Sequence, residues 1–232
     1  MEQTALQYLN HNPIFHMDMI EVIGRGSAQI IAANEKGVLL MDNISGAYML
    51  TVSDQNTGIQ FLDHVTKAEL FVVHQEFCVK EVEKRYPLKR SMICYQGVWN
   101  SKERMDIPYE GLIFQALTEE DTEIVAEMYS HPIAHDYIRG RIQAKEMFGA
   151  FLADKLAGFI GLHEEGSMGM LEVSEEFRRK GIGISLVAYL SNYLLAQGRT
   201  PFSQIVKTNT GSYQMHEKMG FSISEDCLSW LE

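Results

Sequence analysis

The sequence has few cysteines, no long apolar run and no excess of positive charge. Its cysteines, Cys78, Cys94 and Cys227, are an odd number without the spacing of metal ligands, so we expect reduced thiols and no metal centre. No apolar run is long enough to cross a bilayer, and the start Met1-Glu2-Gln3-Thr4 lacks the basic and apolar parts of a signal peptide. These absences predict a soluble, cytoplasmic protein that does not bind membranes.

The charge balance argues against nucleic acid as a partner. The chain carries 31 acidic and 20 basic residues, for a net charge of −11, and the acidic excess is present in both halves. A global basic surface, which attracts a phosphate backbone, is therefore absent. With 232 residues the chain can bury a sizeable core and form one large or two small domains.

Two common phosphate-binding motifs are missing, but a third pattern is present. There is no G-x-x-x-x-G-K-[ST], and G-x-G-x-x-G fails because position 186 is Leu. Instead, an apolar run predicts a strand over 168–173, and Arg178, Gly181 and Gly183 lie in the turn that follows it. Apolar residues at helical spacing predict a helix beyond Gly183. The first amides of a helix lack internal partners, so this strand, basic turn and helix predict a phosphate-binding loop.

The order of the expected elements nearly repeats. Strands are expected over 28–33, 38–41, 47–52, 69–73 and 92–99, and again over 112–116, 147–153, 156–162, 168–173, 202–206 and 222–230. With the helices between them, the second half reads β-α-α-β-β-β-α-β-α-β, and the first half has the same order without its opening strand. A polar stretch over 100–111 separates the halves, and His131-Pro132 is expected to break a helix. We predict two domains, 1–105 and 106–232.

The first half lacks the basic turn. After its matching strand it has Asp54 and then Gln55-Asn56-Thr57-Gly58, without basic residues or paired glycines. We therefore expect one cofactor site per chain.

A second motif follows the basic turn. The segment Asn209-Thr210-Gly211-Ser212-Tyr213-Gln214-Met215-His216-Glu217-Lys218-Met219-Gly220-Phe221 is similar to N-x-x-[AS]-x-x-[LM]-Y-x-K-x-G-F. Together, Arg178-x-x-Gly181-x-Gly183 and this segment resemble the motifs of the GCN5-related N-acetyltransferase (GNAT) superfamily. Within it, Gly166-Ser167-Met168-Gly169-Met170-Leu171 and Pro201-Phe202 resemble the glycine N-acyltransferase-like branch.

The resemblance implies a fold and a cofactor site. The fold is mixed α/β: a mixed sheet flanked by helices, in two tandem GNAT-like domains of which the first is degenerate. The cofactor is acetyl-CoA or another acyl-CoA, with its pantetheine arm in a gap between the strands at 168–173 and 202–206. The residues implied to bind it are Leu171, Glu172, Val173, Arg178, Arg179, Lys180, Gly181, Ile182, Gly183, Ile184, Asn209 and Ser212.

Acyl transfer to an amine needs a base and benefits from an acid. An alkyl amine has a pKa near ~10 and must lose a proton before attack. Glu172, which interrupts an apolar strand, is our candidate base, although it could equally face solvent. The family's usual acid is a Tyr where this chain has His216, and His216 is our candidate acid or, equally, an ordinary helix-face histidine.

Other residues are candidates for the base, for the acid or for selecting the acceptor. His163, Glu164 and Glu165 are weaker candidates for the base, and Tyr213 for the acid. A Glu of the glycine N-acyltransferases corresponds to Ser167 here, so that role does not carry over. Tyr137, Arg139 and Arg141 could select a carboxylate-bearing acceptor, but a solvated helix face explains them more simply.

The function expected is transfer of an acetyl or short acyl group from acyl-CoA to a primary amine of a small molecule or amino acid, by direct attack in a ternary complex. The alternative is a non-catalytic acyl-CoA-binding regulatory or sensor protein, which the missing Tyr favours. A third option makes the first half an interaction module. We expect a monomer or homodimer with a small-molecule amine as its acceptor.

Overall fold

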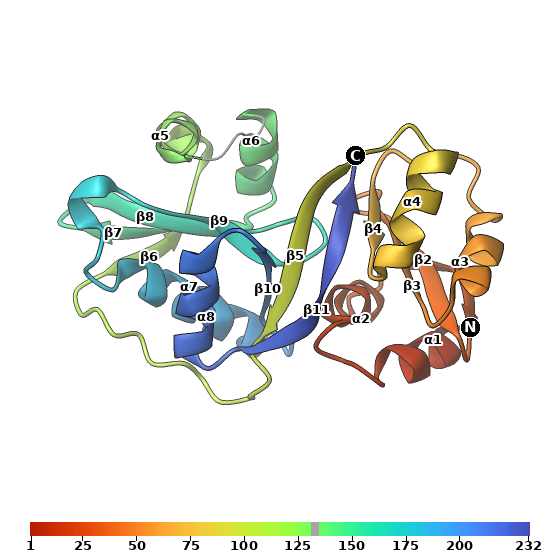
Figure 1. Ribbon diagram of the computed structural model, residues 1–232. Helices are drawn as coiled ribbons and strands as arrows, with labels where there is room; N and C mark the ends of the chain where they lie inside the picture. Colours follow the sequence, from red (N-terminus) through yellow and green to blue (C-terminus); the bar gives the residue numbers. More distant parts are fainter. Residues whose placement is uncertain (131–134) are drawn as a thin grey trace. The chain divides into compact units, whose positions relative to one another are not determined.

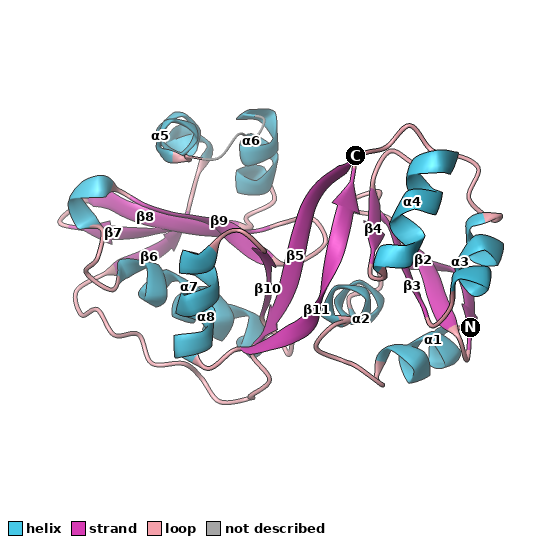
Figure 2. Ribbon diagram, in the orientation of Figure 1, coloured by secondary structure: helices cyan, strands magenta, loops and turns pink. Residues whose placement is uncertain are grey.

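A computed structural model describes residues 1–130 and 135–232, and its contacts divide the chain into two compact units. The first unit comprises Met1–Val98 and Gln204–Glu232, and the second comprises Trp99–Ser203. Figure 1 labels the elements, and Figure 2 shows how helices and strands alternate along the chain. The predicted helix break at His131-Pro132 lies outside the described residues.

The first unit has a sheet with helices on both faces. Its strands follow the order β1-β2-β3-β4-β11-β5, where β1 is Ala28–Asn34, β2 Gly37–Asp42, β3 Tyr48–Val52, β4 Phe71–Val73, β11 Ser222–Leu231 and β5 Arg90–Val98. Its helices are α1 (Glu2–Leu9), α2 (Met17–Gly24), α3 (Gln55–Leu62), α4 (Glu76–Arg85) and α8 (Thr210–Met219). Side chains alternate along β3, so Met49 packs with α1 and α2 while Leu50 packs with α3 and α4.

The grouping differs from the predicted division at residue 105, because the last strand of the chain packs with the first half. Strand β11 pairs antiparallel with β4 on one side and with β5 on the other. Its apolar side chains Leu228 and Trp230 join one core of the first unit, and Leu231 joins the other. A pairing over more than a hundred residues of chain leaves no local sequence signal.

The second unit also has helices on both faces of its strands. The order is β9-β8-β7-β6, where β9 is Met168–Val173, β8 Lys155–Leu162, β7 Met147–Leu152 and β6 Ile113–Ala116. Helices α5 (Thr122–Met128) and α6 (His135–Gln143) cover one face, and α7 (Ile182–Ala196) covers the other (Figure 1). The division between the units falls inside β10 (Phe202–Val206), whose Ser203 pairs in parallel with Met168.

Local signals explain how several elements begin. Thr118 and Asp121 form a reciprocal capping box ahead of α5. The expected linker is held on α7, because the Asn192 side chain hydrogen-bonds both the N–H and the carbonyl of Met105, each at 2.8 Å. No helix among the described residues is long and apolar enough to span a membrane.

Candidate acyl-CoA site

The turn after β9 leaves a row of backbone amides without protein partners. Arg179 and Gly181 have φ of 59° and 86°, in the left-handed region, and the latter is the N-cap of α7. Glycine at an N-cap offers no side-chain oxygen, and no side chain caps this helix. Within the described chain, the amides from Arg179 to Ile184 donate to no protein acceptor. These donors, at the positive end of a helix of 15 residues, suit an anion.

Exposed cations stand beside these amides. The side chains of Arg178, Arg179 and Lys180 all reach solvent. The Arg178 guanidinium folds back, so that its Nε donates to Val173 O at 3.1 Å and its Nη2 lies 3.4 Å from Glu172 Oε1. Its side chain is 49% exposed, so this pair is weak and the guanidinium is available to a phosphate.

The second glycine of the turn has no internal reason to be glycine. A Cβ on Gly183 would meet only Val173 Cγ2, at 3.7 Å, which is an ordinary contact. Its φ is not in the left-handed region either. Since the fold tolerates a side chain there, close approach of a ligand to the backbone explains the residue best.

Strand β9 carries a bulge. Its register with β8 jumps from Phe159↔Glu172 to Gly161↔Gly169, so β9 has an extra residue, and Met170 takes a φ of 49°. A bulge interrupts the ladder and redirects backbone groups. Leu171 and Val173, which the resemblance implies in pantetheine binding, follow this bulge and are half-buried.

Both oxygens of Glu172 are already engaged. Ser130 donates to Oε2 through its N–H at 3.1 Å and its hydroxyl at 2.5 Å, and Arg178 holds Oε1. The side chain is only 11% exposed. This geometry gives Glu172 a role in holding the basic turn, and its role as base stays a prediction. The sequence offered no sign of Ser130, which lies 42 residues earlier.

Asn209, Ser212 and His216 belong to the first unit, where Asn209 and Ser212 form the start of α8 and His216 lies near its end. The Asn209 side chain caps the helix by accepting the Ser212 N–H at 3.0 Å, which explains their spacing physically. His216 is 4% exposed, and its Nδ1 lies 2.9 Å from Ser212 O, an atom that can only accept. Burial lowers the pKa of His216, so the ring is neutral at pH 7 with its proton on Nδ1. Whether it donates a proton to sulfur stays a prediction.

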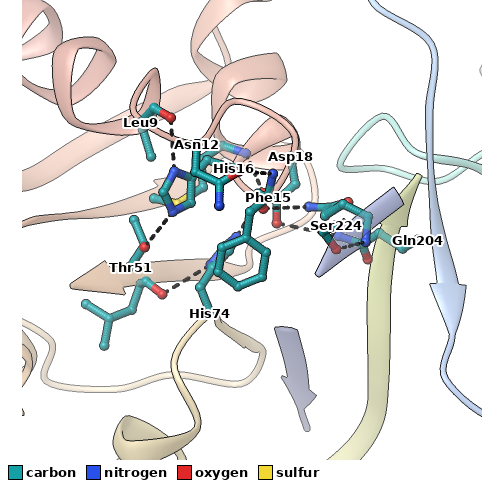
Figure 3. A network of polar contacts seen from close by, with 12 residues as sticks. Leu9, Asn12, Phe15, His16, Asp18, Thr51, His74, Gln204 and Ser224 are labelled. Atoms are coloured by element: carbon teal, nitrogen blue, oxygen red, sulfur yellow. Dashed lines mark hydrogen bonds and ion pairs between the residues drawn. The ribbon is translucent and has the colours of Figure 1, made fainter. Parts of the chain in front are cut away.

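The matching segment of the first unit is closed. Strands β3 and β4 pair in parallel through Tyr48↔Phe71, Met49↔Val72 and Leu50↔Val73, and the His74 N–H continues the ladder to Leu50 O at 3.0 Å. The His74 side chain reinforces this end, with Nε2 3.0 Å from Asp18 Oδ1 and Nδ1 3.2 Å from Leu50 O (Figure 3).

Next to His74, the His16 ring is hydrogen-bonded on both sides (Figure 3). Its Nδ1 lies 3.0 Å from Leu9 O, and its Nε2 lies 2.9 Å from Thr51 Oγ1. These side chains are buried, and they fill the end of the strand pair with protein.

Comparisons with known proteins identify the fold. A family model described as FR47-like protein matches residues 148–230. A Drosophila protein of known structure aligns with a TM-score of 0.65 at 16% identity, over 84% of this chain and 73% of that one. A GCN5-related N-acetyltransferase from Kribbella flavida aligns with a TM-score of 0.59 at 10% identity, over 94% of both chains. The fold is that of the GNAT proteins.

A tandem GNAT protein from the clavulanic acid biosynthesis pathway aligns over 99% of this chain and 94% of its own, with a TM-score of 0.50 and 12% identity. At such low identities these structural alignments show the fold, and the FR47-like match covers residues 148–230. No curated protein is similar enough in sequence to count as a relative.

Proposed function

We propose that the chain is an N-acyltransferase that moves an acetyl or short acyl group from acyl-CoA to a primary amine of a small molecule or amino acid. The uncapped start of α7 carries this proposal: unpartnered amides from Arg179 to Ile184, exposed cations and a glycine that only a ligand explains. GNAT enzymes use acetyl-CoA, and its pyrophosphate carries the charge that such a helix start binds.

In this proposal each part of the second unit has one task. Arg178, Arg179 and Lys180 bind the pyrophosphate together with the amides of Gly181 to Ile184. The backbone of Leu171 to Val173, beyond the bulge, pairs with the pantetheine amides and polarises the thioester carbonyl. Asn209 and Ser212, which belong to the first unit, are implied by the family resemblance alone to contact the pantetheine arm.

Two finer statements belong to the same proposal. The chain is a tandem of GNAT-like domains whose first copy has lost its cofactor site, which the closed β3–β4 pair supports. Its branch is the glycine N-acyltransferase-like one, supported by the segments around Gly166 and Pro201.

The second candidate is an acyl-CoA-binding protein without turnover. The neutral, buried ring of His216, in place of the usual Tyr, favours it, because a neutral ring whose only proton is already donated to Ser212 has none for a leaving thiolate. The two candidates share the binding site and differ in the chemistry.

Calorimetry with acetyl-CoA, followed by thiol release against a panel of amines and amino acids, separates them. Binding with CoA release establishes the transferase. Binding without release on any amine supports the second candidate, and absence of binding contradicts both. Glu172→Gln and His216→Phe then test the predicted base and acid, since full turnover in either variant removes that residue from the chemistry.

A further inference from the structure

His163 lies against β9 immediately before the bulge. It follows β8 in a tight turn, where its N–H donates to Ser167 O and its carbonyl accepts the Gly166 N–H, both at 2.9 Å. A Cβ built on Gly169 would overlap its Nε2 atom. The ring therefore packs directly on the backbone of β9, one residue ahead of Met170, and part of it remains accessible.

Tyr137 fixes the orientation of this ring. Its hydroxyl lies 3.0 Å from His163 Nδ1. Burial, followed by the nearby charge of Glu165, raises the pKa of Tyr137, so the phenol keeps its proton at neutral pH. A hydroxyl can donate to Nδ1 or accept from Nδ1–H, so it supports the ring both before and after Nε2 takes up a proton.

A buried carboxylate lies on the same turn. Glu165 is 5% exposed and accepts a hydrogen bond from the Ser167 hydroxyl. The charged groups around Tyr137 and the ring are Arg141 from α6, whose Nε donates to Leu162 O at 2.8 Å, together with Glu164 and Glu165. Two of these three charged groups are acidic.

Two carboxylates thus flank the bulge from opposite ends of β9, but they differ in engagement. Glu172, at the end nearer the basic turn, is held by Ser130 and Arg178. Glu165 lies in the turn before β9, two residues after His163, and accepts from the Ser167 hydroxyl. His163 therefore packs at the start of β9, and the phosphate loop follows the end of that strand, so a thioester placed along β9 would lie between the two.

We propose that His163, oriented by Tyr137, is the base that takes the proton from the acceptor amine. Nε2 accepts a proton from the alkylammonium, and the freed nitrogen lone pair forms the C–N bond with the thioester carbon. The C–S bond then breaks, the sulfur keeps its electron pair, and the nitrogen of the tetrahedral adduct gives up its second proton, which ends on the thiol. This assignment rests on the proposed function; it gives the role of base to His163 in place of Glu172 and leaves the fold and the cofactor site unchanged.

The test compares two nucleophiles at pH 7 with acetyl-CoA as donor. Alkyl amines, here a panel of glycine, L-lysine, ethanolamine and spermidine, are protonated and need a base, whereas hydroxylamine is neutral and needs none. For His163→Gln we expect kcat/KM with the best alkyl amine to fall by roughly 100-fold or more, while hydroxylamine turnover and acetyl-CoA affinity stay within about twofold of wild type. For Tyr137→Phe we expect kcat/KM with the same amine to fall by roughly 10-fold, with hydroxylamine turnover unchanged. His64→Gln, at an exposed histidine of the first unit, is the matched control.

The outcomes separate the two proposals. Equal amine turnover in His163→Gln and wild type overturns the assignment of the base, and so does an equal loss on amine and hydroxylamine, which would make His163 structural. If wild-type protein binds acetyl-CoA but acylates neither the amines nor hydroxylamine, the proposed function itself fails. Melting temperatures of both variants confirm that each is folded when assayed.

Discussion

Two strand–turn–helix segments, β3 to α3 in the first unit and β9 to α7 in the second, differ in what satisfies the helix amides. At α3, the Asp54 carboxylate accepts the N–H and the hydroxyl of Thr57, both at 2.9 Å. At α7, Gly181 occupies the same place and the amides stay unpartnered in the described structure. The start of a helix attracts negative charge in both segments. At α3 the protein supplies this charge itself through Asp54, whereas at α7 the amides remain available to the negative charge of a ligand.

The strands behind these helices differ in the same sense. Strand β3 pairs with β4 without a break and is sealed by His74 (Figure 3), whereas β9 is bulged at Met170. Even the glycines differ, since a Cβ on Gly58 would collide with Cys78 Sγ at 2.7 Å, while one on Gly183 would fit. Packing against Cys78 therefore requires glycine at position 58, and we attribute the glycine at position 183 to close approach of a ligand.

Introducing an aspartate into the first turn of α7, by analogy with Asp54 at the start of α3, should have the largest effect on acetyl-CoA binding. Gly183→Asp puts a carboxylate among the amides proposed to hold the pyrophosphate, where like-charge repulsion costs about 3 kcal/mol. We expect acetyl-CoA affinity to fall by about 100-fold or more in calorimetry. The melting temperature should not fall, because an acidic residue in the first turn of a helix is favourable.

Gly183→Ala is the matched control for steric effects alone. It should weaken binding less than Gly183→Asp and leave stability unchanged, because the new Cβ makes only an ordinary contact with Val173. Unchanged affinity in both variants would mean that no anion binds at this helix start.

Acid should weaken the closed segment of the first unit. Burial lowers the pKa of His16 from 6.5 to about 4, so the unfolded chain takes up the proton first. The resulting stability is complete above about pH 6.5 and is lost as the pH falls towards 4, by about 3 kcal/mol. Urea unfolding of wild type and His16→Gln at several pH values measures it. If the free energy of unfolding changed with pH equally in both proteins, the result would contradict a buried, neutral His16 ring.

Removing the cap of α3 should cost stability without creating a second site. Asp54→Ala leaves the Thr57 amide unpartnered and should lower the free energy of unfolding by about 1 kcal/mol. Since β3 and β4 remain paired, the number of acetyl-CoA molecules bound should not change. A rise in that number would show that Asp54 alone closes the first segment.

The sequence predicted what local patterns control. The strand over 168–173 appears as expected, because an apolar run acts over a few positions. The start of α7 at Ile182 lies within two residues of the prediction. The mixed α/β fold with helices on the sheet faces is confirmed by the GNAT structures that the chain resembles.

Long-range pairings could not be predicted. Nothing in the segment over 222–231 says that it pairs with both β4 and β5, and the extra residue at Met170 has no sequence signature because methionine does not favour a positive φ. Tyr137 and His163 are 26 residues apart, so their contact appears only in the folded chain. On the sequence alone, His163 is therefore only a weaker candidate for the base.

The stoichiometry of acetyl-CoA binding tests the contrast between the two segments most directly. Calorimetry on wild-type protein should give one molecule per chain, and Gly183→Asp should abolish the heat while Asp54→Ala keeps it. Two molecules per chain, or binding that survives Gly183→Asp, would contradict the account.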